Sequence, residues 1–310
     1  MKISVIICTR NPHPGRLART MDGLSCQSFD AADFEVVIVD NGSSPALADA
    51  SLPVTSRHLG IRVIYEPRAG LTPARLAGIS AARNSLLIFV DDDNVLAPQY
   101  LEVAANEFAA NENLVAAGGP IEPEFESTPP SWLHEFYDLL ALRDVGPTKQ
   151  IVRGGAGKEW PSIAPVGAGL CIRLAAAKEY AELVKNSPTR ITLDRRAGQL
   201  TSGGDNDMVF TAMHGGGDIA HLPQLRLTHL IPSGRLRPDY LGRLNRDVQR
   251  SWVAVLNIHG FCPWPWIPRW SVPMRSVRLW VRTRAWKSPA HSIRYHGLVG
   301  RLHGQADLQP

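Results

Sequence analysis

The sequence predicts an α/β protein with a mainly parallel central sheet flanked by helices, followed by a helical or irregular C-terminal extension. Three observations indicate this architecture. Strand-like and helix-like segments alternate over the first 95 residues. Several predicted strands are continuous apolar runs, as expected where helices cover both faces of a sheet. The basic, tryptophan-containing sequence after residue 236 shows no such alternation.

The N-terminal part is predicted to contain successive strand–helix units. Thr72 followed by Pro73 indicates a helix start, because a threonine hydroxyl can cap free N–H groups and proline lacks one. A further helix is predicted over 97–111 from the core-facing spacing of its apolar residues. Strands are expected at 3–8, 34–40, 61–66, 86–90 and 114–117, with another helix through Leu17, Met21 and Leu24.

The second half is less regular. Residues 118–165 are rich in glycine and proline with scattered aromatic residues, and they are expected to form long loops around a binding cleft. A short strand is predicted within 166–173, a helix from near Asp205 to Gly215, and a last strand at 225–231. Apolar residues at helical spacing predict a helix from Pro238 to Gly260.

Composition excludes several classes of protein. The 310 residues carry a formal net charge of +4, and four widely spaced cysteines indicate neither a disulfide framework nor a zinc site. No apolar segment approaches the roughly 20 residues of a membrane-spanning helix, so a cytoplasmic protein is expected. Charge is uneven: residues 226–301 contain 14 Lys or Arg against two acids, a balance of +12 that leaves −8 for the remainder.

The segment "LLIFVDDDNVL" at 86–96 ends a buried strand in three carboxylates and an amide. Such crowded carboxylates raise one another's pKa unless a cation offsets them, which suggests a site for a divalent metal with oxygen ligands. A solvated turn that caps the next helix is the alternative. Thr9 and Arg10, and Asp40 and Asn41, also follow predicted strands, so all three strand ends are expected to face one crevice.

Common nucleotide-binding signatures are absent. No G-x-G-x-x-G follows the first strand, and "VRGGAGKEW" at 152–160 lacks the first glycine and the Ser or Thr of a P-loop. Dehydrogenase and P-loop functions are therefore excluded.

Seven motifs in order resemble the family 2 glycosyltransferases, whose glycosyltransferase-A fold has a Rossmann-like, mainly parallel sheet. The resemblance covers roughly residues 1–235. Its motifs are "SVIICTRN" at 4–11, Gln27, "EVVIVDNGS" at 35–43, "GLTPARLAGI" at 70–79, the DxD-like "DDDN" at 91–94, "GAGLCIR" at 167–173 and "GGDNDMVF" at 203–210.

The resemblance implies a donor site. Asp40 would recognise the nucleotide base, and Thr9, Arg10 and Asn41 would line the same pocket. Asp93 would ligate the metal and Asp91 would contact the ribose or the metal. The cluster, Asp92 included, would hold Mg²⁺ or Mn²⁺ against the diphosphate of a sugar nucleotide.

Two arginines and a histidine are further candidates. Arg68 and Arg75, near the start of the predicted Thr72 helix, are expected to add positive charge near the phosphates, or else to be surface arginines. His229 ends the "LRLTH" stretch of the last predicted strand, and the resemblance implies a histidine from this region as a metal ligand. A structural histidine is the alternative.

The resemblance also implies a general base, Asp205, that takes the proton from the acceptor hydroxyl. Family members usually carry a Glu-Asp pair here, and Gly204 replaces the glutamate. Asp207 is the rival carboxylate. Two residues apart on a helix, Asp205 and Asp207 face different ways, so only one of them can address the acceptor.

The function implied is an inverting, metal-dependent glycosyltransferase of the hexosyltransferase type. It would move one sugar from a nucleotide-diphosphate sugar to a glycan or a polyprenyl-linked saccharide, in bacterial surface polysaccharide biosynthesis. The processive QxxRW motif is absent, so one sugar per encounter is expected. The expected regions are 1–118, binding the nucleotide sugar; 119–236, binding the acceptor and carrying the base; and 237–310, the basic extension.

Three other functions share some of these features. A nucleotidyltransferase acting on sugar phosphates also clusters carboxylates at strand ends, but it is expected to show a glycine-rich loop that "CTRNPHPG" lacks. A non-catalytic sugar-nucleotide-binding protein would not need Asp205. Nucleic-acid binding by the basic end is disfavoured because no recognised module accompanies it.

The basic end itself allows two interpretations. Between Arg269 and Arg301, tryptophans alternate with Arg or Lys and no acid intervenes. This composition suits peripheral docking on an anionic membrane, at the inner face of the plasma membrane. Arg278, Trp280, Val281 and Arg282 do not give one clean apolar face, however, so a helix packed on the catalytic part is the alternative.

Overall fold

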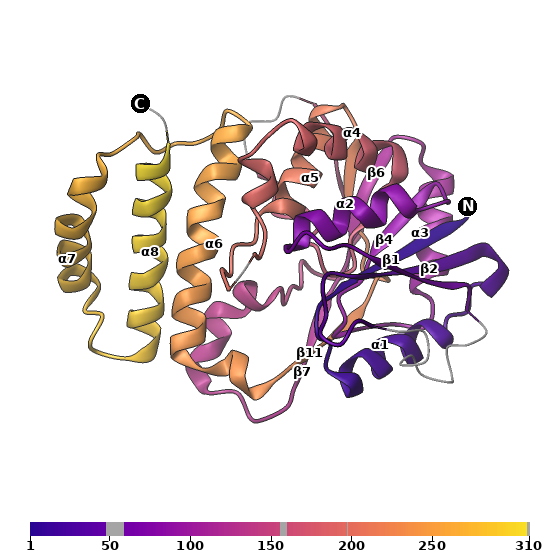
Figure 1. The fold of residues 1–310 in the computed structure, drawn as a ribbon, viewed down its shortest axis with the longest axis horizontal. Coiled ribbons are helices and arrows are strands. Elements are labelled where there is room, and N and C mark those ends of the chain that lie inside the picture. Colours follow the sequence, from indigo (N-terminus) through magenta and orange to yellow (C-terminus); the bar gives the residue numbers. More distant parts are fainter. Residues whose placement is uncertain (48–58, 156–159, 197, 309–310) are drawn as a thin grey trace.

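A central eight-stranded sheet organises the protein, with strand order β3-β2-β1-β4-β9-β6-β10-β8 (Figure 1). The computed structural model describes residues 1–47, 59–155, 160–196 and 198–308. Apart from β8 and β9, the strands of this sheet run in one direction, as the alternating sequence predicts. The strands are β1 (Ile3–Thr9), β2 (Phe34–Asp40), β3 (Ile61–Tyr65), β4 (Leu86–Phe89), β6 (Leu114–Gly118), β8 (Gln150–Val152), β9 (Cys171–Arg173) and β10 (Asp218–His221).

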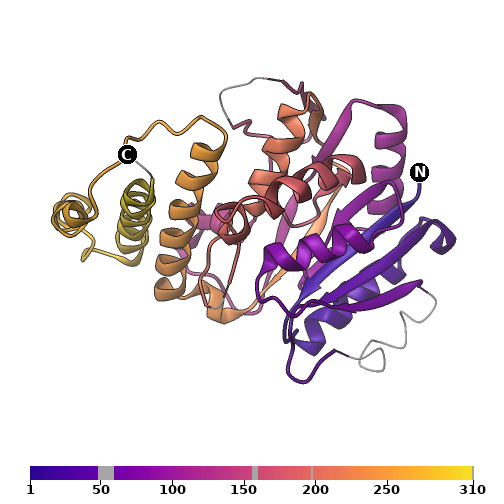
Figure 2. The same cartoon turned by 45° about the horizontal axis from the view of Figure 1, so that its top comes forward.

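Helices cover both faces of this sheet (Figures 1 and 2). Alternate residues of one strand enter different cores: Ile7 of β1 joins a core with Met21 and Phe108, whereas Ile6 joins a core with Tyr180. The central strands are therefore apolar on both faces, which is why they lack polar alternation. The first core includes residues of α1 (Pro14–Ser25) and α3 (Tyr100–Ala110), and helices from the C-terminal part also contribute to it. The second core includes residues of α2 (Leu71–Ala81), α4 (Leu174–Lys185) and α5 (Gly204–His214).

A second, three-stranded sheet has the order β5-β11-β7. It joins β5 (Asn94–Leu96), β7 (Ile121–Phe125) and β11 (Leu227–Ile231), with β11 antiparallel to β5 and parallel to β7. Because β5 begins inside the acidic motif, this small sheet fixes the far side of the acidic turn.

Three helices form the C-terminal part, at the end of the molecule opposite the N-terminus (Figure 1). These are α6 (Pro238–Ile258), α7 (Val272–Thr283) and α8 (Pro289–Asp307). The central one, α8, packs on both α6 and α7. Short 3-10 helices complete the regular structure: η1 (Ala31–Asp33), η4 (Ser131–Leu140), η5 (Arg190–Thr192), η6 (Ser233–Leu236) and η7 (Arg269–Ser271).

Two sequence-based expectations need correction. Thr72 does not cap α2, because the helix begins at Leu71 with Gly70 at the cap, where φ is 135°, and the buried Thr72 hydroxyl donates to Asp194 instead. Residues 118–165 are not loops alone, since they include β7, η4 and β8. The long helix after Pro238 and the helix near Asp205 are confirmed.

Candidate active site

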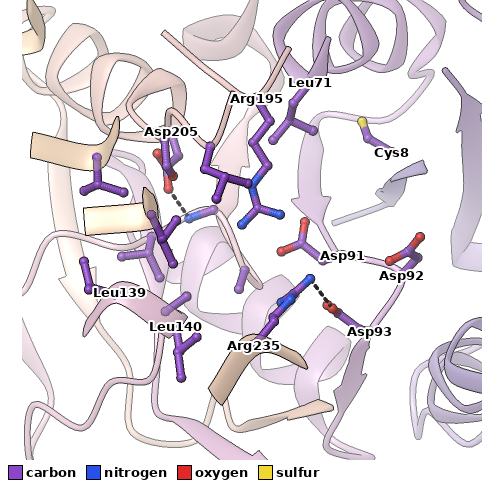
Figure 3. A pocket seen from close by; sticks show the side chains of 18 of the residues that line it. Cys8, Leu71, Asp91, Asp92, Asp93, Leu139, Leu140, Arg195, Asp205 and Arg235 are labelled. Carbon is purple, nitrogen blue, oxygen red and sulfur yellow. Dashed lines mark hydrogen bonds and ion pairs between the residues drawn. The ribbon is translucent and has the colours of Figure 1, made fainter. Parts of the chain in front are cut away.

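A cavity of about 740 Å³ opens at the carboxyl ends of β1 and β4 (Figure 3). One wall is the acidic turn, and another comes from the start of α5 and the loop before β9. Helix α6 closes a further side with Tyr240, Leu244 and Trp252. The crevice expected at the strand ends is therefore present, and it draws on segments spread over most of the chain.

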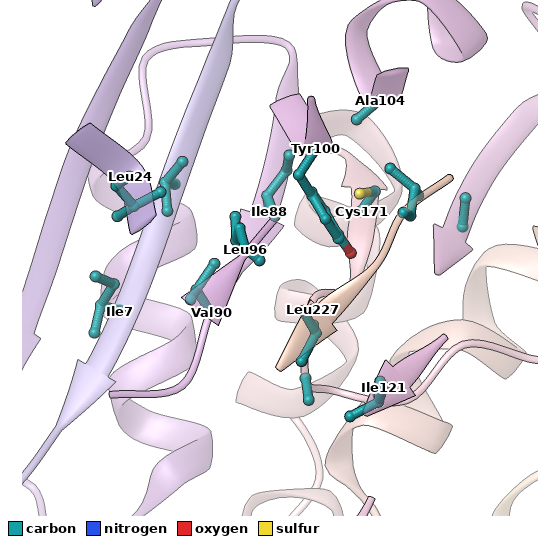
Figure 4. Packing of buried hydrophobic residues seen from close by; sticks show 14 of the residues in the cluster. Ile7, Leu24, Ile88, Val90, Leu96, Tyr100, Ala104, Ile121, Cys171 and Leu227 are labelled. Carbon is teal, nitrogen blue, oxygen red and sulfur yellow. The ribbon is translucent and has the colours of Figure 1, made fainter. Parts of the chain in front are cut away.

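The acidic turn is held from beneath by the core (Figure 4). Val90 and Leu96, on either side of the turn, are buried in the same core as Ile7 and Leu24. Within the turn, the Asn94 side chain accepts a hydrogen bond from the Asp91 backbone N–H at 3.3 Å, and the Asn94 N–H donates to the Asp91 carbonyl at 3.0 Å. The turn thus presents its carboxylates from a rigid base.

Asp93 is the most buried of these carboxylates. It lies against one side chain from β11 and one from the segment that follows β11. The Arg235 guanidinium is 3.0 Å from Asp93 Oδ2, and His229 Nε2 is 3.5 Å from Asp93 Oδ1. His229 Nδ1 lies 2.9 Å from the Leu140 carbonyl, and Arg235 Nη1 lies 3.0 Å from His229 Nε2. Both hydrogen bonds are satisfied by the tautomer with its proton on Nδ1, which leaves the Nε2 lone pair facing Asp93.

This arrangement suits a bound cation. A histidine lone pair beside a carboxylate oxygen is repulsive unless positive charge lies between them, and Arg235 supplies that charge here. An imidazole whose other nitrogen donates to a carbonyl is the usual form of a metal-ligating histidine. The part of the chain that the structure describes contains no preassembled group of three or more potential ligands. The donors Asp93, His229 and Asp91 therefore fit a divalent metal only if the Arg235 guanidinium moves aside.

The charges of the turn are unevenly stabilised. Burial, together with the charge of Asp93, raises the pKa of Asp91. Burial raises the pKa of Asp92 to about 6, although the Thr9 hydroxyl donates a hydrogen bond to it. Burial alone would raise the pKa of Asp93 too, but the Arg235 guanidinium opposes it, and His229 adds a hydrogen bond to Asp93 when both of its ring nitrogens are protonated, so that the pKa of Asp93 is held below its usual range. The site therefore carries an excess of carboxylates that a further cation would relieve.

Asp205 lies across the cavity from the acidic turn, in the first turn of α5 (Figure 3). Its Oδ2 accepts a hydrogen bond from the Gly167 N–H at 2.7 Å. Gly167 is needed there, since a Cβ on it would lie 3.1 Å from that oxygen and 2.5 Å from an Arg75 nitrogen. The "GAGLCIR" motif thus supports Asp205 from behind.

Asp207 has a different environment. It is fully buried, its Oδ1 lies 2.5 Å from Arg190 Nη1 and 2.8 Å from His259 Nε2, and it does not line the cavity. The expectation that the two carboxylates face different ways is confirmed. Asp205 is the one that faces the cavity.

Asp194 was not a sequence-based candidate, yet it links several parts of the site. Its carboxylate accepts hydrogen bonds from Arg75 at 2.8 Å, from Thr72 at 3.2 Å and from the Gly204 N–H at 2.9 Å. A Cβ on Gly204 would lie 2.2 Å from Asp194 Oδ2. The absent glutamate of the Glu-Asp pair therefore leaves room that the Asp194 carboxylate fills.

The remaining predicted residues divide into two groups. Thr9, Arg10, Asn41 and Arg75 line the cavity together with the acidic turn and His229. Among the described lining residues neither Asp40 nor Arg68 occurs.

Asp40 and Arg68 stabilise the loops behind the cavity instead. Burial would raise the pKa of Asp40, but hydrogen bonds from the Ser43 and Leu47 backbone N–H groups, at 2.9 and 2.8 Å, lower it. Arg68 pairs with Glu66 at 2.8 Å on the surface. Asn41 anchors the same region, since its amide donates to the carbonyls of Glu66 and Arg68.

Besides Asp194, which lies outside the cavity lining, three residues that do line the cavity were not expected from the sequence. Arg195 reaches between Asp205 and Asp91, Arg235 pairs with Asp93, and Trp252 of α6 lies edge-on to Trp160 with ring centroids 5.6 Å apart (Figure 3). The sequence "LDRRAG" at 193–198 places an acid next to two arginines, and this pattern could have marked Asp194 and Arg195 as candidates. Nothing local marks Arg235, because its partner lies in a distant part of the chain.

Comparison with protein families shows that residues 4–162 match the model of glycosyl transferase family 2. Among curated proteins, the uncharacterized glycosyltransferase EpsJ of Bacillus subtilis is 28% identical over 117 residues, which are 37% of this chain and 33% of that protein. The glucosyl-dolichyl phosphate glucuronosyltransferase of Haloferax volcanii is 22% identical over 148 residues, 47% of each chain. The chain thus spans less than half the length of either relative.

Among solved structures, residues 1–349 of S. aureus TarS in complex with UDP-GlcNAc superimpose with a TM-score of 0.55 at 16% identity. The match covers 98% of this chain and 90% of that one. The same TarS segment with UDP gives a TM-score of 0.53. At this identity the likeness shows a shared fold, which is of the glycosyltransferase-A type.

Proposed function

Because the chain belongs to glycosyltransferase family 2, we propose that it is an inverting, metal-dependent glycosyltransferase that transfers one sugar from a nucleotide-diphosphate donor. One observation carries this proposal: Asp205 and the carboxylates of the acidic turn face one cavity from opposite sides, with Arg195 and Arg235 between them (Figure 3). The carboxylate that takes the proton and the carboxylates that hold the diphosphate must act on opposite sides of the transferred sugar, so they are expected on opposite sides of the cavity.

In the proposed reaction, Asp205 accepts the proton of an acceptor hydroxyl as that oxygen attacks the anomeric carbon of the donor sugar. The bond from the anomeric carbon to the diphosphate oxygen breaks, and a nucleoside diphosphate leaves. The Gly167 N–H orients the carboxylate of Asp205 through Oδ2. Attack from the side opposite the leaving group inverts the anomeric centre.

The leaving diphosphate needs positive charge. A divalent cation, Mg²⁺ or Mn²⁺, would supply a Lewis acid for it, held by Asp93, Asp91 and His229. Arg195 and Arg235 are placed to bind phosphate oxygens, since guanidinium groups match them with paired hydrogen bonds. Arg75 stays paired with Asp194, so its charge acts at longer range.

We assign the aromatic part of the cavity to the acceptor. Trp160 and Trp252 line the same cavity as Asp205 and Asn206, and aromatic walls with a few polar groups are typical of sites for small organic ligands. We propose a glycan or lipid-linked saccharide as acceptor, in bacterial surface polysaccharide assembly. The proposal includes a cytoplasmic site of action and peripheral association with an anionic membrane. None of the helices in the described ranges combines the length and apolar character needed to cross a bilayer.

A panel of uridine, guanosine and thymidine diphosphate sugars, each with Mn²⁺, tests the donor assignment by thermal stabilisation. A ligand present at 100 times its Kd adds about 2.7 kcal/mol of stability, so one donor should raise the melting temperature clearly. Incubation with that donor should then release a nucleoside diphosphate. No stabilisation by any sugar nucleotide would contradict the proposal, and pyrophosphate release from a nucleoside triphosphate with a sugar phosphate would favour a nucleotidyltransferase instead.

A further inference from the structure

A stripe of exposed apolar residues runs over the outer side of α7 and the 3-10 helix η7 before it. Met274, Val277 and Val281 follow one another at intervals of three and four residues, which places them on one face of α7, and Trp270 lies in η7, four residues before Met274. Trp270, Met274, Val277 and Val281 are 78%, 50%, 64% and 55% exposed. The sequence-based view that this region lacks a clean apolar face is therefore corrected, since the face begins at Trp270 and excludes Trp280.

The other side of α7 already has a partner. Val272 is buried in a small core with Ile267 and Ala306, and Leu302 of α8 packs against it. The helix is thus attached to the protein through α8, and the apolar stripe is not needed for that attachment. Among the described residues, none covers the stripe, so a binding partner would have to cover it.

Positive charge flanks the stripe. Arg275, Arg278 and Arg282 are exposed on one side of it, and no acidic residue occurs between Asp247 and Asp307. Within the described residues, none of these three arginines forms an ion pair. Trp280 packs on Trp286 with ring centroids 4.5 Å apart, at the end of the helix where Arg284 and Lys287 add further charge.

We propose that the outer face of α7 docks on an anionic lipid bilayer, with the Trp270–Val281 stripe in the headgroup region and the flanking arginines against lipid phosphates. An interfacial helix combines this kind of apolar face with Lys or Arg beside it. Two copies of this chain meeting through the same face would bring their unpaired arginines together, which like-charge repulsion opposes. An anionic surface instead complements both the charge and the tryptophan.

This inference rests on the proposed membrane association and assigns its surface. Helices α7, α8 and α6 lie side by side, and α6 lines the cavity (Figures 1 and 2). The docked membrane would therefore lie beyond α7, on the far side of the C-terminal helices from the donor site. Membrane binding and donor binding use separate residues and can be measured separately.

The test is flotation of the full chain with phosphatidylglycerol-containing and purely phosphatidylcholine vesicles, at low and high salt. One variant removes the stripe, Trp270→Ser/Met274→Ser/Val277→Ser, and a second removes the charge, Arg275→Gln/Arg278→Gln/Arg282→Gln. The matched controls are Leu183→Ser, an exposed apolar residue of α4, and Arg83→Gln/Arg153→Gln/Lys178→Gln, which removes three exposed cations elsewhere. All substituted side chains are exposed, so folding should be preserved.

The wild type should bind anionic vesicles in a salt-sensitive manner and neutral vesicles weakly. The charge variant should bind roughly 100-fold more weakly, since each basic residue near an anionic surface contributes about fivefold. The stripe variant should lose binding too, and both controls should keep it. The proposal is overturned if the wild type does not float with anionic vesicles at low salt. It is also overturned if the stripe and charge variants float as well as the wild type, or if the protein dimerises through the stripe and does not bind vesicles. Sugar-nucleotide binding should be the same in all variants, and its absence from all would refute the proposed function without affecting the docking surface.

Discussion

Removal of the Asp194 carboxylate should destabilise the protein strongly. Asp194 and the Arg75 side chain that it pairs with are 1% and 8% exposed, and their closest N–O distance is 2.8 Å. Burial would lower the pKa of Arg75, but Asp194 and Asp205 outweigh it and raise that pKa, so Arg75 stays charged. Asp194→Ala therefore leaves a buried charge without its main partner.

Breaking one side of a buried ion pair costs about 3–5 kcal/mol. Asp194 also accepts hydrogen bonds from the Gly203 and Gly204 N–H groups at the start of α5, which places the loss at the upper end of that range. A protein is typically stable by about 5–15 kcal/mol, so the effect should be a large fraction of the whole.

Urea unfolding followed by circular dichroism measures this loss. Glu182→Ala is the matched control, because Glu182 also pairs with a cation but on the surface, and little change is expected there. The double variant Asp194→Ala/Arg75→Met should recover part of the stability, because no buried charge is then left unpaired. A loss below about 1 kcal/mol for Asp194→Ala, or no recovery in the double variant, would refute the reasoning.

Three further predictions concern the cavity. Asp205→Asn should leave donor binding nearly intact and slow sugar transfer by about 10²- to 10⁴-fold, whereas Asp207→Asn should lower stability and leave the transfer rate unchanged. If steady-state kinetics show the loss of transfer in Asp207→Asn and not in Asp205→Asn, the base is Asp207. The pKa of Asp92 is raised to about 6, so its ionisation destabilises the fold as pH rises from about 4 to 6. The free energy of unfolding of Asp92→Asn, measured in urea at pH 7.5, should therefore exceed that of the wild type by ~1–2 kcal/mol, a value that allows for the partial exposure of Asp92. At pH 4 the two free energies of unfolding should be almost equal. Arg235→Ala should tighten Mn²⁺ binding without nucleotide on the order of tenfold, equivalent to ~1.4 kcal/mol, because the guanidinium no longer holds Asp93 and His229; unchanged or weaker binding by electron paramagnetic resonance would contradict that role.

Much of the fold could be predicted because its signals are local. The apolar runs of β1, β2 and β4 and the spacing within α6 appear within a few residues of one another. The small sheet could not be predicted in this way, since β11 pairs with β5 and β7 from more than 100 residues away. Short strands of this kind are defined by their partners rather than by their own composition.

The candidate site divides on the same principle. Thr9, Asn41 and the acidic turn follow strand ends, so the sequence could place them at one edge of a sheet. The contacts that set their charges come from elsewhere: Arg235 reaches Asp93, and Asp194 fills the room beside Gly204. The exposed stripe of α7 was missed for a different reason, because its spacing is visible only when Trp270 is counted with the helix that follows it.

The most direct test of the metal-dependent donor site is calorimetric titration of uridine, guanosine and thymidine diphosphates into the wild type and Asp93→Ala, with Mn²⁺ and again with a chelator. At least one nucleotide should bind the wild type with Mn²⁺, the chelator should abolish this binding, and Asp93→Ala should remove most of it. The reason is that the carboxylates of the acidic turn otherwise face the diphosphate with like charge. Equal affinity with metal and with chelator, or equal affinity of both proteins, would contradict the assignment of this cavity as a metal-dependent donor site.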